Sequence, residues 1–250
     1  MATSAAPRPN AFLLAESPSA TQERPQLLSR LSPKEREMVL RLGQRKVIER
    51  GKPVFTQGEP HDGIYLVESG LVKVFYTAPS GREITLAYWY PGNFVGGPDI
   101  YAGGAHIWSG IAARTSSVLA LKGQDLRLLI ERFPGLALGV IDGLVFKGKC
   151  YSALAQMLGT RSVTERLFRL LDVLCDIYGI AESDGLLIGA AFSHEDLAHM
   201  VGATRQWVTV SLNRLGEQGI VRLPKGRIVV LDRAALRDGR AARAKRKAAQ

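Results

Sequence analysis

The spacing of apolar residues changes along the chain and divides it into regions of different character. Between Val47 and Leu121, short runs of β-branched and aromatic residues recur between glycines at intervals of about ten residues. Short strands separated by turn residues in this way are typical of a small β-barrel or sandwich, and no long helical pattern fits there. We therefore expect a β-domain in the first half of the chain.

Helical spacing begins after Phe133-Pro134, because proline is tolerated in the first turn of a helix. From there, apolar or small residues alternate at spacings of four and three, the a/d pattern of a contact between two helices. They are Ala137, Ile141, Leu144, Gly148, Tyr151, Ala155 and Leu158. The small residues let two backbones approach closely, so this stripe predicts a dimer interface; the alternative is that it only covers the β-domain. A second amphipathic helix is expected from Ser162 to Tyr178.

The segment from Phe192 to Val230 predicts a helix, a tight turn, a second helix and a short hairpin. Ser193 caps the first helix, and Gly202 permits the left-handed backbone of the turn. Thr204 caps the second helix, which ends before Gly219 and has a buried stripe of Val208, Leu212 and Leu215. The hairpin turns at Pro224-Lys225-Gly226. This order is typical of a winged helix-turn-helix, which places its second helix in the major groove of DNA.

The outer face of the second helix and the hairpin carry the candidate DNA contacts. These residues are Thr204, Arg205, Gln206, Trp207, Thr209, Val210, Asn213, Lys225 and Arg227. The alternative interpretation is an ordinary helical hairpin with a solvated charged face.

Composition and charge agree with a polyanionic partner. The 250 residues carry a formal charge of +10, and the sequence pI is about 9.9. From Arg233 to Gln250 there are seven basic residues against one acidic residue, which predicts a mobile tail that strengthens phosphate contacts or only improves solubility. We expect a disordered segment over 1–25, a sensory β-domain over 26–133, a dimerisation helix over 134–160, a DNA-binding domain over 161–235 and a basic tail over 236–250.

Other classes of protein are not supported by the sequence. The two cysteines, Cys150 and Cys175, are too few for a disulfide scaffold, a four-cysteine zinc site or an all-cysteine iron–sulfur cluster. No signal peptide or membrane span is expected, so we predict a cytoplasmic protein without membrane contact. No catalytic arrangement of side chains or phosphate loop is present, so we do not expect an enzyme. A ligand-binding module that acts on a protein partner remains the alternative function.

The order of these elements resembles the Crp/Fnr family of bacterial transcription regulators. The resemblance covers about residues 27–235 and rests on VFTQGEPHDGIYLVESGLVKVF from Val54, PGNFVGG from Pro91, VTERLFRLL from Val163 and the helix-turn-helix segment. It implies an α+β fold with a cyclic-nucleotide-binding-like β-roll (jelly-roll), a long dimerisation helix and a winged helix-turn-helix. It also implies a cytoplasmic homodimer, an activator or repressor, that binds palindromic promoter DNA and affects RNA polymerase.

Two departures from the family pattern change the expected specificity. The family's ribose-binding Glu corresponds to Gly97, and its phosphate-binding Arg-Ser pair falls near Ile107-Trp108, so we do not expect cyclic AMP as the effector. Gly96, Gly97, Ile107 and Trp108 mark the expected effector pocket. Backbone N–H groups of the glycines can still donate to a nucleotide, so nucleotides other than cyclic AMP are not excluded. In the reading helix, Gln206 replaces a Glu and Val210 an Arg, which favours a different operator.

The effector itself stays open. Tyr88, Trp89, Tyr90, Tyr101 and Trp108 suit an aromatic effector or ordinary core packing. Haem ligation by His61 and His106 is not expected, and an N-terminal cysteine set for an iron–sulfur cluster is absent. Redox-responsive Cys150 or Cys175, or no effector at all, are the remaining alternatives.

Overall fold

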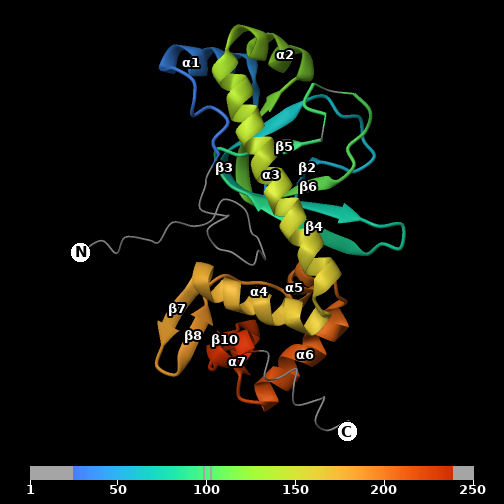
Figure 1. Ribbon diagram of the computed structural model, residues 1–250, viewed down its shortest axis with the longest axis vertical. Helices are drawn as coiled ribbons and strands as arrows, with labels where there is room; N and C mark the ends of the chain where they lie inside the picture. Colours follow the sequence, from blue (N-terminus) through green and yellow to red (C-terminus); the bar gives the residue numbers. More distant parts are fainter. Residues whose placement is uncertain (1–24, 98, 102, 239–250) are drawn as a thin grey trace, which may run out of the picture. The chain divides into compact units, whose positions relative to one another are not determined.

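The computed structural model describes residues 25–97, 99–101 and 103–238, which form two compact units (Figure 1). Unit 1 comprises residues 1–153 and unit 2 residues 154–250. Apart from Pro25, the expected disordered segment 1–25 lies outside the described residues, as does the part of the basic tail after Asp238.

Unit 1 is built on one antiparallel sheet, which confirms the predicted β-domain. Its strands are β1 (Gln44–Ile48), β2 (Pro53–Phe55), β3 (Ile64–Thr77), β4 (Glu83–Trp89), β5 (Phe94–Gly96) and β6 (Ser109–Leu121). The order is β1-β6-β3-β4, with β2 on β6 and β5 on β3. Glycines allow the close approaches in this sheet: at Gly70, with φ of 87°, an added Cβ would lie 2.3 Å from Ser116 Oγ.

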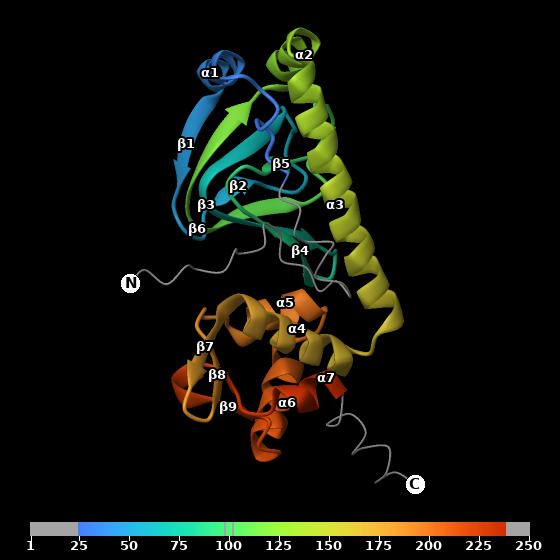
Figure 2. The same cartoon turned by 60° about the vertical axis from the view of Figure 1, so that its left-hand side comes forward.

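Three helices complete unit 1 (Figure 2). They are α1 (Pro33–Leu42), α2 (Gly123–Arg132) and the first part of α3 (Pro134–Thr160). Ser32 and Glu35 form a capping box at the start of α1. The bounds of α3 are those that the apolar spacing predicts.

The side of α3 that faces the sheet follows a second stripe with the same alternating spacing. It runs through Leu136, Val140, Gly143, Lys147 and Cys150, one position before the stripe of the predicted interface. Leu136, Val140 and Cys150 belong to the buried cores over the sheet. At Gly143 an added Cβ would lie 2.5 Å from the Phe94 ring, so the helix packs tightly there. The face of α3 that covers the sheet is therefore not the predicted interface stripe, and several residues of that stripe are solvent-exposed.

Unit 2 contains the helix-turn-helix on a small four-stranded sheet, as the fold class predicts. Its helices are α4 (Val163–Tyr178), α5 (His194–Val201), α6 (Arg205–Glu217) and α7 (Arg233–Asp238). Its strands are β7 (Gly179–Glu182), β8 (Gly185–Ile188), β9 (Val221–Arg222) and β10 (Val229–Val230), in the order β7-β8-β10-β9. The hairpin β7–β8 is missing from the sequence prediction, which ends at Gly179 and resumes at Phe192. It extends the predicted hairpin into a sheet.

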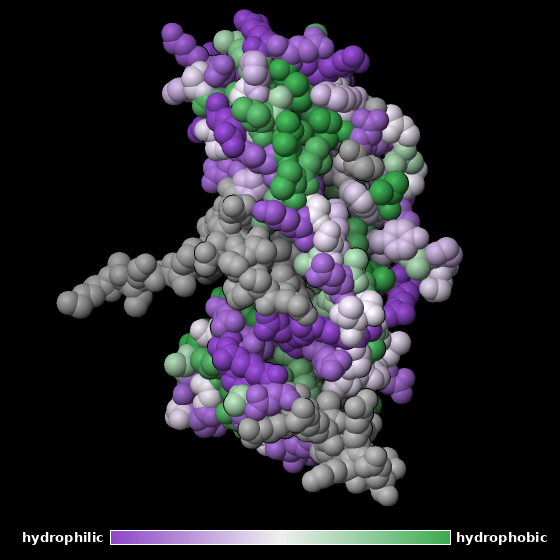
Figure 3. Space-filling model, in the orientation of Figure 1, coloured by the Kyte–Doolittle hydropathy of each residue, from purple (hydrophilic) through white to green (hydrophobic). Residues whose placement is uncertain are grey.

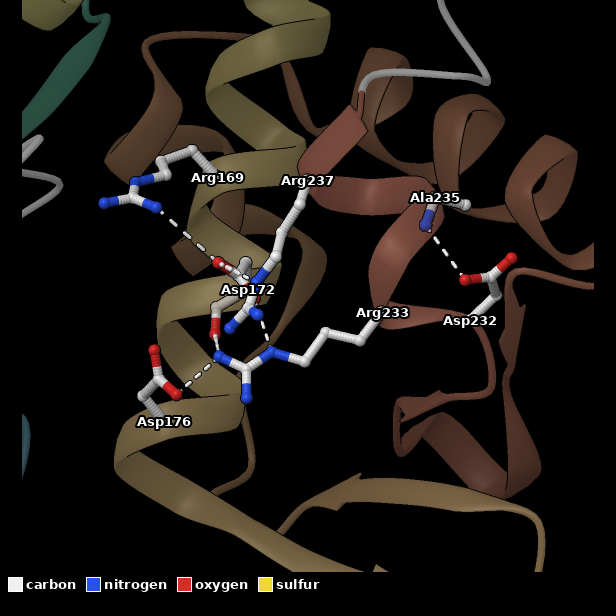
Figure 4. Close-up of polar contacts among 7 residues, drawn as sticks. All are labelled: Arg169, Asp172, Asp176, Asp232, Arg233, Ala235 and Arg237. Carbon is white, nitrogen blue, oxygen red and sulfur yellow. Dashed lines mark hydrogen bonds and ion pairs between the residues drawn. The ribbon is translucent and has the colours of Figure 1, made fainter.

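The start of the predicted tail needs a correction. Residues 236–238 are not tail but the end of α7, and Leu236 is buried. Arg233 and Arg237, which the sequence analysis counts with a mobile basic segment, both bind the buried carboxylate of Asp172 on α4 (Figure 4). Their charges are therefore engaged inside unit 2 rather than available to a distant polyanion.

None of the helices in the described part of the chain combines the length and apolar character needed to cross a bilayer.

Candidate nucleic-acid interface and ligand cavity

The turn between α5 and α6 is set by local capping interactions. Ser193 and Asp196 form a capping box at the start of α5, and Gly202 adopts the left-handed conformation with φ of 66° and ψ of 46°. Thr204 Oγ1 then accepts a hydrogen bond from Trp207 N at 3.2 Å and starts α6. The predicted caps and turn are confirmed, and together they fix the direction in which α6 leaves α5.

The two faces of α6 differ sharply. Val208, Leu212 and Leu215 are buried, as the sequence predicts. On the opposite face Arg205, Gln206, Val210 and Asn213 are exposed, with Val210 at 56%. The Arg205, Gln206 and Asn213 side chains have no hydrogen-bond partner among the described residues. The structure thus presents two polar amides, one cation and one apolar side chain along one free helix face.

Two other predicted contacts on α6 are less available. Trp207 and Thr209 are only partly exposed. Thr209 Oγ1 donates to Arg205 O at 3.0 Å and lies 2.8 Å from His194 Nδ1. The Thr209 hydroxyl thus contacts both the backbone of α6 and the first side chain of α5. Thr209 therefore ties α6 to α5 instead of pointing freely outward.

The hairpin after α6 exposes two further cations. Residues Pro224–Gly226 form a 3-10 turn in which Lys225 has φ of 48° and Gly226 has φ of 75°. Lys225 and Arg227 are exposed and have no ion-pair partner in the described ranges. Arg222, on β9, is held instead by Glu182 at 3.2 Å and Asp184 at 2.9 Å, both from the β7–β8 hairpin. Lys225 and Arg227 are thus the free charges of this wing.

Unit 1 contains a cavity of about 280 Å³ between the sheet and α3. Its lining is mostly apolar and aromatic. The residues are Val74, Trp89, Phe94, Val95, Gly96, Gly97, Trp108, Leu144, Lys147, Gly148 and Tyr151. A small pocket with apolar walls and few polar groups is the usual form of a ligand site.

Of the four expected pocket residues, three line this cavity and one does not. Gly96, Gly97 and Trp108 line it, and Trp108 Nε1 donates to Gly96 O at 2.7 Å. Ile107 does not line it, and 50% of its side chain is exposed. At Gly97 an added Cβ would lie 2.1 Å from the His61 ring, so a Glu at this position would require His61 to move. Among the aromatic residues that the sequence singles out, only Trp89 and Trp108 reach the cavity.

Lys147 is the residue of this site that the sequence analysis missed. Its Nζ donates to Phe94 O at 2.6 Å and lies 3.8 Å from the centre of the Trp89 ring. Burial lowers the pKa of Lys147 to about 7. The sequence marks Lys147 only as the one charged residue in the second stripe of α3, and periodicity does not show that this stripe faces the sheet.

His61 and His106 pack against each other beside the cavity. Their ring centres lie 4.7 Å apart, and both residues are buried. Among the described residues, neither His61 Nε2 nor His106 Nδ1 has a hydrogen-bond partner. The described residues contain no group of three or more His, Cys, Asp or Glu side chains placed to hold a metal ion. The pair is therefore a buried neutral contact whose stability depends on pH.

Acidification is expected to destabilise unit 1 through this pair. Burial lowers the pKa of both imidazoles below the ordinary value of 6.5, and the His61 ring lowers that of His106 further. Their stabilising contribution is complete above pH 6.5 and is lost as the pH falls toward the lowered values, because the unfolded chain then binds more protons. We expect the melting temperature of unit 1 to decrease from about pH 7 to about pH 5.5. In the variant His61→Gln/His106→Gln this decrease in melting temperature should be smaller. A variant whose melting temperature depends on pH as in the unsubstituted protein would contradict this account.

The two thiols do not support redox sensing. Burial raises the pKa of Cys150 to about 12 and that of Cys175 to about 11. The thiolate is the form that reacts with oxidants, so both groups stay in the unreactive form near neutral pH.

The exposed face of α3 carries an apolar surface (Figure 3). Ile141 is 52% exposed, and Leu138, Leu144 and Val145 are also exposed. Gly148 has no atom within 4 Å of an added Cβ, so nothing in the described chain requires a glycine there. Of the predicted interface residues, Ile141, Leu144, Gly148 and Ala155 are exposed, and Leu158 is partly buried. Tyr151 is partly buried and lines the cavity, as Leu144 and Gly148 also do, and its ring centre lies 5.9 Å from that of Trp108.

Two parts of the chain each match a known domain family. Residues 45–133 match the cyclic nucleotide-binding domain, and residues 165–238 match the Crp-like helix-turn-helix domain. The cyclic AMP receptor protein of Thermus thermophilus is 31% identical over 209 residues, which are 83% of this chain and 93% of that protein. The global nitrogen regulator of Synechococcus elongatus is 31% identical over 77% of this chain and 88% of its own length.

Solved structures share the fold. The global regulator CLP of Xanthomonas campestris, described as c-di-GMP responsive, has a TM-score of 0.74 at 21% identity over 80% of this chain and 100% of its own. A CRP-family transcriptional regulator of Thermus thermophilus has a TM-score of 0.63 at 26% identity, over 76% of this chain and 94% of its own. Two of these names refer to different small molecules, cyclic AMP and c-di-GMP, so the similarity leaves the ligand of this chain open.

Proposed function

The chain belongs to the Crp/Fnr family of DNA-binding transcription regulators, and we propose that it acts as a homodimer on palindromic promoter sites under the control of a small effector bound in unit 1. In this proposal, residues 26–133 sense the effector, 134–160 form the dimer contact and 161–235 bind DNA. Its place of action is the cytoplasm, where it contacts promoter DNA and affects RNA polymerase.

The free face of α6 is the observation that carries the proposal. Arg205 is suited to guanine or phosphate, and Gln206 can form a bidentate pair with adenine. Val210 offers an apolar surface that fits a thymine methyl group. We therefore expect an operator whose bases differ from those read by family members with Glu and Arg at these two positions. Lys225 and Arg227 on the wing supply phosphate contacts beside it.

The exposed apolar face of α3 supports the dimer. A surface centred on Ile141 and Leu144 is costly to leave in water, and Gly148 allows a second backbone to approach. A twofold dimer places one α6 in each of two successive major grooves, about 34 Å apart, which accounts for a palindromic site.

Selection of bound sequences from a random duplex library, followed by gel-shift titration at physiological salt, tests this function. We expect one inverted-repeat sequence to be enriched and to bind at least about a thousandfold more tightly than random DNA. Enrichment of no sequence, or binding that depends only on charge, would contradict the proposal and favour a module that acts on a protein partner.

Arg205→Ala is expected to weaken binding to the selected site by about 1–3 kcal/mol and to relax the preference at one base pair of each half-site. Arg214→Ala is the matched control, because Arg214 is exposed on the same helix but lies two turns further from its N-terminus. The control should lose less affinity and keep every base preference. An equal loss on all sequences for Arg205→Ala would make Arg205 a phosphate contact.

A further inference from the structure

Lys147 presents an electrostatic problem that the described chain does not solve. An ammonium group has three donors and no acceptor, and among the described residues the only hydrogen bond of Lys147 is to Phe94 O. The Trp89 and Phe94 rings contact the charge, at 3.8 Å and 4.6 Å from their centres. No carboxylate of the described residues forms an ion pair with it. The Lys147 side chain is partly buried, and a charge that loses hydration without an anionic partner is costly, so the site favours an anion from outside the chain.

The walls of the cavity define the rest of the ligand. Trp89, Phe94, Trp108 and Tyr151 supply aromatic surface, and Val74, Val95 and Leu144 supply aliphatic surface. Lys147 is the one formally charged side chain in this lining. A ligand with several hydroxyl groups would lose hydrogen bonds to water on these walls, whereas a flat apolar body would gain by burial. A volume of about 280 Å³ lies near the lower end of the range for small-molecule sites.

We propose that the effector is a small organic acid, with a flat apolar body that packs between the aromatic walls and one acidic group that pairs with Lys147. Only the ligand's role as an effector rests on the proposed function. Binding of the acid in the cavity does not depend on DNA binding. A phosphodiester carries a single negative charge as well, but a polar sugar attached to it would lose hydrogen bonds to water on these apolar walls, so an acid with an apolar body fits better.

A matched pair of probes separates charge from shape. Calorimetric titration of the full chain without DNA would compare 2-naphthoate with its neutral amide, 2-naphthamide. We expect naphthoate to bind at least about tenfold more tightly, since an ion pair with hydrogen bonds is the strong kind of polar contact. Equal affinity for the acid and the amide, or binding of neither, would overturn the inference.

Two lysine variants on the same helix locate the acid group. Lys147→Met should lose about tenfold or more in affinity for naphthoate while it still binds naphthamide, which shows that the cavity remains formed. Lys149→Met removes the same charge from an exposed position outside the cavity and should leave naphthoate binding unchanged. A similar loss in both variants would mean that only the general charge of α3 matters, and the inference would fail.

The pH dependence gives an independent readout. Naphthoate binds the protonated lysine, so its affinity should fall as the pH rises above about 7 and the free Lys147 loses its proton. The other titratable groups near the cavity are Cys150 and Tyr151 on α3, whose pKa values burial raises, and His61, which packs against Gly97. In Lys147→Met the fall between about pH 7 and about pH 8.5 should disappear. A fall that persists in this variant would assign the dependence to another group and contradict the inference.

DNA binding is measured separately on the same samples. If the protein binds naphthoate through Lys147 but binds no DNA sequence specifically, the proposed function is refuted and the acid site stands. The reverse result would keep the regulator and refute the acid site.

Discussion

Ile141→Asp is expected to convert the dimer into folded monomers and to lower the affinity for a palindromic site by about a hundredfold or more, because each monomer then holds only one half-site. Ile141 is half-exposed on the apolar face of α3, so aspartate there does not disturb the core of a single chain. In a symmetric pair of helices the two substituted residues would face each other, which places like charges in an apolar contact. Sedimentation velocity measures the mass, and gel-shift titration measures the affinity.

Two controls separate loss of the interface from loss of the fold. Leu128→Asp introduces the same charge at a 65% exposed apolar residue on α2, outside the predicted interface, and should remain dimeric. Mixing Ile141→Asp with Ile141→Lys should restore a dimer of opposite charges and recover DNA binding. If Ile141→Asp stays dimeric with unchanged affinity, the dimer contact lies elsewhere.

Asp172→Ala is expected to destabilise unit 2 by about 3 kcal/mol or more. The Asp172 carboxylate is 3% exposed and accepts hydrogen bonds from Arg233 and from Arg237, the latter at 3.0 Å; Arg169 lies 3.6 Å away (Figure 4). Removing this carboxylate leaves cations of α4 and α7 partly buried without it, which costs far more than losing an ordinary surface ion pair.

Native-state hydrogen exchange of the full chain measures this loss of stability helix by helix, because it reports the opening free energy of each helix separately. The amides of α4 and α7 should exchange faster in Asp172→Ala, while those of β3 and β6 in unit 1 serve as the internal reference. Asp176→Ala removes an exposed carboxylate that binds the same Arg233, and it should cost less than about 1 kcal/mol. Equal effects of the two substitutions would show that burial of Asp172 is not what matters.

The elements that could be predicted from the sequence are those governed by neighbouring residues. The capping residues Ser193 and Thr204 and the left-handed Gly202 act over a few positions, so their effects can be recognised in a single chain. The bounds of α3 follow from Pro134 and from periodicity in the same way. Short connections join the elements of the winged helix-turn-helix. The exposed face of α6 could therefore also be predicted from residues close to it in the sequence.

The remaining features depend on contacts between residues far apart in the sequence. Lys147 meets the Phe94 carbonyl across 53 positions, and Asp172 meets Arg233 across 61, so neither contact has a local signal. On α3, two stripes with the same spacing differ by one position, and periodicity alone does not say which of them meets the sheet. Periodicity therefore also gave no sign that Tyr151, a residue of the predicted interface stripe, lines the cavity.

Leu144 and Gly148 line the cavity and also belong to the exposed stripe of α3. A molecule in the cavity and a second chain on α3 would thus share two residues, and the two equilibria would be coupled. Such coupling is reciprocal: a ligand that strengthens association must itself bind more tightly to associated chains, by the same factor. The apparent dissociation constant of the ligand would then depend on the total protein concentration. A titration in dilute solution and one in concentrated solution would report different affinities for the same site, and their ratio would measure the coupling free energy directly.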